Sequence, residues 1–378
     1  MNKIYDCIVI GGGPSGSTAA YHLANKGINV LLIDKAVFPR YKPCGGGVCP
    51  GVAHWLDIDY KPTISHYVNK ICTTWNLGMP IEGELGENTS LWMVRRETFD
   101  NYLLENAEKK GAKIQQNTSL LDIEDQGDYW LVKTDQGDYS ARYVIGADGA
   151  KGISAKCLGF KDRKRIIAGA LEVEIPLDKL EDETLYLEFG MVRNGYLWNF
   201  PKADGFSMGV EAFNSKDSKK LHSILDNYIS GSGVDSKDSK KFGHPICFWD
   251  GKQKLHTKRA VLAGEAACVV DPLTAEGIRP SIISATLAAN AVSDALEGNV
   301  NALSNYSEQI HEELGKEFIW AKRLAKLCYG FPKIYYNAVI KQPGALRTLG
   351  RHIAGEVKYS ELVEKALKRL KIAGFIGK

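Results

Sequence analysis

The eight cysteines of this 378-residue sequence form no C-x-x-C pair, which argues against a cysteine-based zinc site. We therefore expect no metal and reduced thiols, as in a cytoplasmic protein. No apolar run approaches the ~18 residues that a membrane-spanning helix needs. The first residues lead directly into an apolar strand, so we expect no targeting segment. These absences favour a cytoplasmic protein without a membrane anchor.

A strong net charge is also absent, because the formal charge is only +3. We therefore expect no nucleic-acid partner. The small total conceals an asymmetry, since residues 315–378 carry 14 Lys+Arg against 4 Asp+Glu. A basic amphipathic segment can lie on an anionic membrane surface. The alternative is a solvated helical cap that packs its apolar face on the core. We expect this packing, and we keep contact with a membrane surface as an additional expectation.

A glycine-rich turn near the N-terminus has the flanking elements of a dinucleotide-binding unit. Residues 4–9 predict a buried strand and residues 11–16 read GGGPSG. Residues 17–25 predict a helix, and residues 29–33 predict a second strand that ends at Asp34. The order of strand, G-x-G-x-x-G, helix, strand and acid is typical of the βαβ unit that binds a dinucleotide.

Each residue type in this turn has a physical reason. Gly11 permits the tight turn, Gly13 lets the backbone approach a pyrophosphate, and Gly16 lets the helix pack close to the strand. The helix N-terminus offers unpaired N–H groups to the phosphates. Asp34 is spaced correctly for a ribose hydroxyl.

Later segments return to the dinucleotide sheet after a β-rich excursion. A predicted meander over residues 120–145 leads into the sequence GADG, and residues 166–254 predict a larger antiparallel sheet. The predicted architecture is an α/β fold with a discontinuous Rossmann-type dinucleotide domain (residues 1–65, 95–165 and 255–300), an inserted antiparallel-sheet substrate domain (66–94 and 166–254) and a helical C-terminal region (301–378).

Two motifs that contain an acid follow predicted strands. Asp148 can cap a helix or contact the cofactor, and Glu265 can hydrogen-bond ribityl hydroxyls. Residues 271–278 open a long helix, whose N-terminus can stabilise negative charge on a reduced flavin. Arg95 precedes another predicted helix.

Residues 38–48 form a loop that contains Cys44 and three consecutive glycines. Three glycines in a row do not suit a helix or a central strand, so the backbone is expected to pass close to something flat or bulky. A lone cysteine is most often a small buried apolar side chain. In a cofactor loop, the Cys44 thiol is also one candidate general acid.

An aromatic stripe occurs in the inserted domain at Tyr196, Trp198 and Phe200. Alternate residues of a strand share a face, so these three rings form one apolar wall. From the residues alone, ordinary core packing under the sheet is favoured over a cavity wall.

Together these motifs make the sequence resemble FAD-dependent proteins such as p-hydroxybenzoate hydroxylase, the flavin halogenases and the geranylgeranyl reductases, over residues 1 to about 300. Two stretches are similar to the geranylgeranyl reductase family: the cysteine–triple-glycine loop and the sequence YLWNFP at 196–201. The sequence departs from the common pattern at Glu265, where aspartate is usual, and at Cys268, where glycine is common.

This resemblance implies resident FAD, bound by the residues named above and their neighbours. The implied cofactor-binding residues are Gly11, Gly13, Pro14, Ser15, Gly16, Asp34, Lys35, Arg40, Cys44, Gly45, Gly46, Gly47, Val48, Arg95, Leu121, Asp148, Gly149, Gly264, Glu265, Gly277 and Ile278. It also implies that Tyr196, Trp198, Phe200 and Pro201 line a lipid cavity. Cys44 is the expected catalytic residue, nearest the reacting alkene.

The implied activity is saturation of C=C bonds in a geranylgeranyl or polyprenyl chain on a lipid or diphosphate carrier. An isolated C=C bond accepts hydride poorly, so the reaction also needs a proton donor. One alternative is an aromatic hydroxylase or halogenase that uses the same cofactor with O2. A second is an FAD-binding or redox-sensing protein without catalysis.

The sequence contains no second G-x-G-x-x-G after a strand. An external reductant, NADPH or a ferredoxin or flavodoxin, is therefore expected to dock transiently. We expect a monomer whose substrate is a prenyl lipid.

Overall fold

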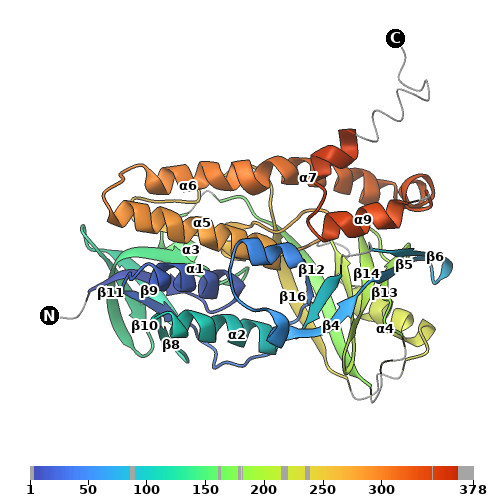
Figure 1. Cartoon of the computed structure of the whole chain (residues 1–378), viewed down its shortest axis with the longest axis horizontal. Coiled ribbons are helices and arrows are strands. Elements are labelled where there is room, and N and C mark those ends of the chain that lie inside the picture. Colours follow the sequence, from blue (N-terminus) through green and yellow to red (C-terminus); the bar gives the residue numbers. More distant parts are fainter. Residues whose placement is uncertain are drawn as a thin grey trace, which may run out of the picture.

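Two large sheets, one mostly parallel and one mostly antiparallel, form the two halves of the molecule (Figure 1). A layer of helices lies over both halves. The arrangement confirms the predicted Rossmann-type α/β fold with a second sheet and C-terminal helices. The computed structural model describes residues 4–85, 90–160, 163–177, 180, 182–213, 220–234, 239–342 and 344–364.

The parallel sheet has a Rossmann core with an antiparallel edge. Its strands are β1 (Ile4–Ile10), β2 (Val30–Ile33), β8 (Lys113–Gln115), β9 (Leu120–Asp125), β10 (Trp130–Thr134), β11 (Gly137–Gly146) and β17 (Ala260–Leu262). The order is β8-β2-β1-β11-β10-β9, and β17 pairs in parallel with β11. β1 is central and its Cys7, Ile8 and Val9 are fully buried. Such a continuous apolar run is typical of a parallel strand covered on both faces.

Helices α1 (Pro14–Asn25), α2 (Arg96–Lys109) and α5 (Ile278–Leu296) pack together beside this sheet. Helix α2 buries Phe99, Leu103 and Leu104 on one face. The N-terminal turns of α1 and α5 lie close together, since a Cβ on Gly264 would meet both the Ser15 Cβ (2.7 Å) and the Ser281 Oγ (3.1 Å).

The second sheet provides a broad wall. Its strands are β5 (Lys70–Trp75), β6 (Gly78–Glu84), β12 (Ile166–Pro176), β13 (Leu185–Phe189), β14 (Gly195–Lys202), β15 (Gly205–Ala212) and β16 (Lys241–Phe248), in the order β16-β12-β15-β14-β13-β5-β6. Helix α4 (Leu221–Gly231) packs its Leu225 and Ile229 on one face, against Leu197 and Val210. The opposite face of the sheet is therefore free to line a cavity.

A small third sheet joins the two halves. It consists of β3 (Gly47–Val48), β4 (Ile64–Val68) and β7 (Leu91–Val94). β3 directly follows the triple-glycine loop, and its two residues pair with Met93 and Trp92. Pairing to β7 thus fixes one end of the glycine loop.

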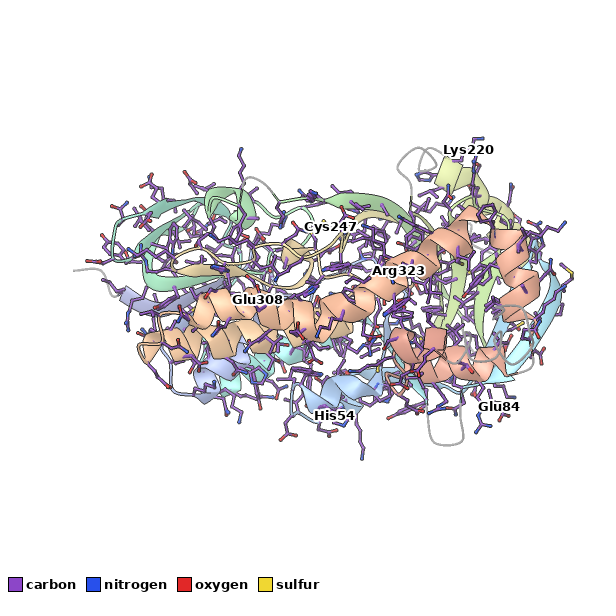
Figure 2. All side chains as sticks on the ribbon, turned by 90° about the horizontal axis from the view of Figure 1, so that it is seen from above. His54, Glu84, Lys220, Cys247, Glu308 and Arg323 are labelled. Atoms are coloured by element: carbon purple, nitrogen blue, oxygen red, sulfur yellow. The ribbon has the colours of Figure 1, made fainter. Side chains whose placement is uncertain are left out.

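The C-terminal region is helical over the part of it that the structure describes. It comprises α6 (Ala302–Ile310), a π-helical turn (His311–Gly315), α7 (Lys316–Gly330), α8 (Pro332–Tyr335), a second π-helical turn (Tyr336–Ile340) and α9 (Ala345–Ile353). Figure 2 shows α6 and α7, labelled at Glu308 and Arg323, running as one rod across both halves. Residues 365–378 of the predicted region lie outside the described residues.

Among the helices that the structure describes, none has the length and apolar character needed to cross a bilayer.

Candidate active site between the two sheets

A cavity of about 520 Å³ connects the glycine-rich turn of the first sheet with the aromatic strand of the second. Its polar end is lined by the turn, the end of β2 and the glycine loop. Its apolar end is lined by β13, β14, α7 and α9. The cavity thus joins a dinucleotide fingerprint to an apolar chamber.

The glycine-rich turn has the backbone geometry that its sequence predicts. Gly11 has φ +104°, and a Cβ on Gly16 would lie 1.7 Å from the Gly11 carbonyl oxygen. A Cβ on Gly13 would meet only Arg40 Nη2, at 3.6 Å, so the turn is open on the cavity side. The Ser15 hydroxyl is buried there without a hydrogen-bond partner among the described residues.

Asp34 holds the turn in place while it lines the cavity. Its Oδ2 accepts a hydrogen bond from the Gly12 N–H at 2.6 Å, and its Oδ1 accepts one from the Ala36 N–H at 2.7 Å. The acid therefore fixes the relation between the end of β2 and the turn.

Arg40 brings a partly buried cation to the polar end. Its Nη2 lies 2.8 Å from Asp100 Oδ2, while its Nη1 is buried without a partner among the described residues. Asp100 also receives two hydrogen bonds from Arg96, each 2.7 Å long. Burial opposes ionisation of Asp100, but Arg96 and Arg40 hold its pKa below the ordinary value.

The triple-glycine loop passes against β14, which supplies the bulky neighbour that the glycines predict. A Cβ on Gly45 would lie 2.8 Å from the Phe200 ring, and one on Gly46 would lie 2.1 Å from the Val94 carbonyl oxygen. The buried Lys202 ammonium donates to the carbonyls of Gly45 (2.5 Å) and Val94 (2.9 Å). Lys202 therefore ties the loop to the edge of β7.

Cys44 lies in this loop and lines the cavity, half-buried. Its Sγ accepts a hydrogen bond from the Gly46 N–H at 3.4 Å and is within hydrogen-bonding reach of the Arg96 guanidinium. Burial opposes the charge on Arg96, but Asp100 and then Cys44 keep its pKa above the ordinary value. The hydrogen-bond donors of Gly46 and Arg96 thus hold the thiol in position.

Glu265 lines the cavity after β17. Its Oε1 accepts from the Cys247 N–H at 3.1 Å, and its Oε2 lies 3.4 Å from His244 Nε2. Lys42 Nζ is 3.2 Å from the same imidazole nitrogen. Burial works against ionisation of Glu265, but His244 and Lys42 bring its pKa below the ordinary value.

Asp148 serves the capping role that was one of its two predicted functions. Its Oδ1 accepts from the Ser154 hydroxyl at 2.6 Å and its Oδ2 accepts from the Ser154 N–H at 2.8 Å. These bonds fix the start of the short helix α3 (Ser154–Cys157). Burial raises the pKa of this carboxyl.

The aromatic stripe of β14 lies on the cavity face. Tyr196, Trp198 and Phe200 all line the cavity, with successive ring centroids 6.4 Å apart. A Cβ on Gly209 would lie 2.0 Å from the Trp198 ring, so this glycine makes room for the indole. The Tyr196 hydroxyl donates to the Thr274 carbonyl at 2.9 Å, which anchors the loop before α5.

Apolar side chains from neighbouring β13 and from more distant elements complete the chamber around this stripe. They are Leu91, Leu185, Leu187, Phe189, Cys328, Ile340, Leu349 and Ile353.

Most of the predicted site residues meet at this cavity. Those that line it are Gly11, Gly13, Pro14, Ser15, Asp34, Lys35, Arg40, Cys44, Gly45, Gly46, Gly47, Asp148, Gly149, Tyr196, Trp198, Phe200, Glu265, Gly277 and Ile278.

Three predicted cofactor contacts are not at the cavity wall. Arg95 points away from the cavity and pairs with Glu174 (2.8 Å) and Asp204 (2.5 Å). The next residue, at the first position of α2, lines the cavity in its place. Leu121 is 59% exposed on β9, a strand at the far edge of the sheet. Val48 is buried in the core, since its place in β3 turns it away from the chamber.

Three further predicted residues support the wall from behind. Gly16 packs against the glycine-rich turn. Gly264 leaves room for Ser15, because a Cβ on Gly264 would lie 2.7 Å from the Ser15 Cβ. Pro201 alternates with Phe200 on β14 and so faces away from the cavity.

Sequence reasoning missed four buried charged groups near the cavity: Arg96, Glu172, Lys202 and Glu211. Lys202 had a usable signal, because it continues the alternation from Phe200 by two residues. The others depend on neighbours that are remote in the sequence, so no local pattern identifies them.

The residues at the polar end fit a dinucleotide. The unpartnered Ser15 hydroxyl and Arg40 Nη1 face the open side of the turn, where hydrogen-bond acceptors such as phosphate oxygens would satisfy both. The bare Gly13 leaves space for a ligand there. Fold and site together define an FAD-dependent oxidoreductase.

Comparison with known proteins specifies the family. A family model described as an FAD binding domain matches residues 5–189. The chain is 32% identical over 322 residues to the chloroplastic geranylgeranyl diphosphate reductase of Arabidopsis thaliana, covering 79% of this chain and 67% of the relative. It is 29% identical over 332 residues to the digeranylgeranylglycerophospholipid reductase of Methanocaldococcus jannaschii, covering 83% and 82%. The chain belongs to the geranylgeranyl reductase family.

A solved structure shares the fold over nearly the whole length. The geranylgeranyl bacteriochlorophyll reductase-like protein of Thermoplasma acidophilum superimposes with a TM-score of 0.79 at 23% identity, covering 98% of this chain and 96% of the other.

Proposed function

We propose that this protein is an FAD-dependent reductase that saturates C=C bonds of a geranylgeranyl or polyprenyl chain on a lipid or diphosphate carrier. The observation that carries the proposal is the continuity of the cavity, which runs from the dinucleotide turn to an apolar chamber. The names of the relatives from Arabidopsis thaliana and Methanocaldococcus jannaschii agree with this substrate class.

The residues divide into two groups along the cavity. Ser15 and Arg40 would hold the phosphates of FAD, and Asp34 its ribose. Bound reduced FAD supplies a hydride from its N5 atom. Tyr196 and Trp198 orient the prenyl chain and exclude water from it. Cys44, fixed by the tied-down glycine loop, is the group that we place nearest the reacting double bond.

Product analysis tests this function. The protein is loaded with FAD, reduced with dithionite without oxygen, and incubated with geranylgeranyl lipids and geranylgeranyl diphosphate. We expect mass increments of two hydrogens for each saturated bond. Oxygen-dependent hydroxylation or halogenation of an aromatic compound, with no such increments, would support the alternative enzyme class. A protein that takes up no FAD would leave only a non-catalytic role.

Cys44→Ala tests the assignment of the reacting centre. We expect turnover to fall while bound FAD is retained, because Cys44 contacts the chamber but holds no phosphate. The matched control is Cys157→Ala, since this half-buried cysteine lies on α3 outside the cavity lining. Equal turnover in both variants would remove Cys44 from the reaction.

We also propose that the protein takes its substrate from an anionic membrane surface. Four apolar side chains of α7, α8 and the following π-helical turn are exposed, and we call them the α7–α8 patch: Leu327 (48% exposed), Phe331 (60%), Ile334 (63%) and Val339 (40%). Exposed lysines at 326, 333 and 341 lie among them in the sequence. Such a mixture suits an interface with anionic lipid.

The same segment also reaches the chamber. Cys328, Tyr335 and Ile340 line the cavity, while the α7–α8 patch lies outside. A prenyl chain therefore has a short path from a membrane into the site. Reduction by NADPH or by a ferredoxin or flavodoxin would then occur from the water-exposed side.

Vesicle sedimentation tests the membrane proposal. We expect the FAD-loaded protein to bind vesicles rich in phosphatidylglycerol and not vesicles of phosphatidylcholine alone, and we expect Phe331→Ser with Ile334→Ser to weaken binding. Val300→Ser is the control, because Val300 is 93% exposed in the α5–α6 turn at the opposite end of the rod (Figure 1). Equal binding by all three proteins would disprove the contact.

A further inference from the structure

A buried carboxyl lies where the polar and apolar ends of the cavity meet. Glu211 is on β15, opposite Tyr196 of β14 and Ala170 of β12, and all three line the cavity. Glu211 is only 2% exposed, and its Oε1 has no hydrogen-bond partner among the described residues. An acid with a free oxygen in such a place needs an explanation, because an unsatisfied buried polar group costs free energy.

The surroundings of Glu211 favour its neutral form. The titratable groups that face it are Tyr196 from β14, Tyr329 from α7 and Glu265 from the turn after β17. No cation is among these three, and Glu265 is an acid. Burial, then the charge of Glu265, raises the pKa of Glu211 to about 8. Glu211 therefore holds a proton at neutral pH.

Two other buried carboxyls of the same sheet show that this arrangement is particular to Glu211. Glu172 also lines the cavity, but it accepts a hydrogen bond from the Tyr41 hydroxyl at 3.0 Å. Glu188 lies outside the cavity lining and accepts from Asn76 N–H at 2.7 Å and Leu77 N–H at 3.1 Å. Only Glu211 of the three combines the cavity wall with an unengaged oxygen.

Resting on the proposed function, we propose that Glu211 is a catalytic residue that donates the proton needed to saturate the double bond. The reaction adds a hydride, contributed by bound reduced FAD, to one alkene carbon. The π electrons form a C–H bond between the other carbon and the Glu211 carboxyl proton. The resulting carboxylate then regains a proton from water at the polar end of the cavity.

This assignment gives Glu211 and Cys44 different tasks. The Cys44 sulfur accepts from the Gly46 N–H and faces Arg96, so the groups around it are donors. The Oε1 of Glu211 receives no hydrogen bond, because the hydroxyls of Tyr196 and Tyr329 donate instead to the carbonyls of Thr274 and Leu273. Its carboxyl therefore has a proton to give. The thiol thus positions the reacting bond, and the carboxyl supplies the proton.

Infrared spectroscopy tests the protonation state without turnover. Glu211→Gln is nearly isosteric, so the FAD-loaded variant should fold and keep its flavin. We expect the wild type at pH 7 to show a carbonyl band of a protonated carboxyl that Glu211→Gln lacks, and that disappears as the pH rises past about 8. Identical carbonyl bands in the two proteins at pH 7 would overturn the proposal.

The pH profile of turnover tests the catalytic step. A proton donor contributes about 10²- to 10⁴-fold, so we expect Glu211→Gln to lose at least about 100-fold in kcat. The wild-type kcat should fall above pH 8, and Glu211→Asp should keep a shifted form of this limb. Glu188→Gln is the control, which lowers thermal stability but leaves the profile unchanged.

The outcomes separate the two proposals. If no wild-type preparation reduces a prenyl chain, the proposed function fails, whatever the infrared band shows. If the wild type is active and Glu211→Gln matches its kcat and pH profile, the function stands and Glu211 is not the donor. If Glu211→Gln only weakens FAD binding and keeps kcat when saturated with FAD, Glu211 is a cofactor contact and the proposal is likewise wrong.

Discussion

The two ends of the cavity are built in opposite ways. Much of the polar end comes from one part of the chain, residues 11–47, where the backbone of the glycine turn approaches Asp34 and leaves Ser15 unpaired. The apolar end is assembled from side chains of β13, β14, α7 and α9, which are far apart in the sequence. One end thus depends on backbone geometry and the other on side-chain volume.

This difference predicts unequal tolerance to substitution. A backbone contact cannot yield without moving a whole element, whereas a chamber wall can lose one ring and keep its other members. Changes at the polar end should therefore affect FAD and folding, and changes at the apolar end should affect the substrate alone.

The largest effect is expected for Gly16→Val. Its Cβ would lie 1.7 Å from the Gly11 carbonyl oxygen, so α1 must shift away from β1. Overpacking of this kind costs about 1–3 kcal/mol, and if relieving it displaces the phosphate-binding turn by the same free energy, FAD binding weakens by up to roughly 100-fold. Flavin release measured by fluorescence checks it. Gly13→Ala, whose Cβ meets only Arg40 at 3.6 Å, should fold normally and lose less affinity. Equal FAD affinity in Gly16→Val and wild type would contradict the dependence of the polar end on backbone geometry.

Trp198→Ala tests the apolar end. The variant should retain FAD, and KM for the prenyl substrate should rise about thirtyfold through the loss of about 2 kcal/mol of apolar contact. Steady-state kinetics and the flavin spectrum measure both quantities. Leu197→Ala is the control, because Leu197 is the neighbour on β14 that packs on the α4 side. A loss of FAD from Trp198→Ala would mean that the two ends are not separable.

Lys202→Met tests the tie between the ends. Two buried carbonyls, those of Gly45 and Val94, lose their donor. We expect a loss of about 2 kcal/mol in the free energy of unfolding, measured with urea, since unsatisfied buried groups cost about 1–3 kcal/mol. Cys44 should also react faster with a thiol reagent as the loop loosens. Lys220→Met, at an exposed lysine (Figure 2), should change neither quantity.

A pH-dependent difference in stability is expected at the boundary between the two ends. The folded-state pKa of Glu211, about 8, exceeds its ordinary 4.5. The stability from its protonated form is therefore full below pH 4.5 and lost as the pH rises through 8. Glu211→Gln should match the wild type near pH 4 and be more stable than it above pH 8, by thermal melting. The reverse order would indicate that the folded protein favours the ionised carboxylate.

Much of the fold was predictable because its signals are local. The first βαβ unit, the β9–β10 hairpin and most strands of the second sheet each follow from composition and period. β6 was not predicted, since it is only partly buried and packs on α9, which follows more than two hundred residues later in the chain. Arg95 was predicted to contact the cofactor but lies outside the cavity lining, because a helix start does not reveal which of two adjacent arginines turns inward.

The amino-acid sequence by itself determined the dinucleotide turn and the shared face of Tyr196, Trp198 and Phe200. Backbone sterics at glycine and the two-residue period of a strand act over a few residues, so the sequence expresses them directly. Only the tertiary structure decided that this face meets the glycine loop, that Lys202 joins them, and that Glu211 is buried without a partner. Burial and electrostatic surroundings are sums over groups distant in the chain, which no local pattern encodes.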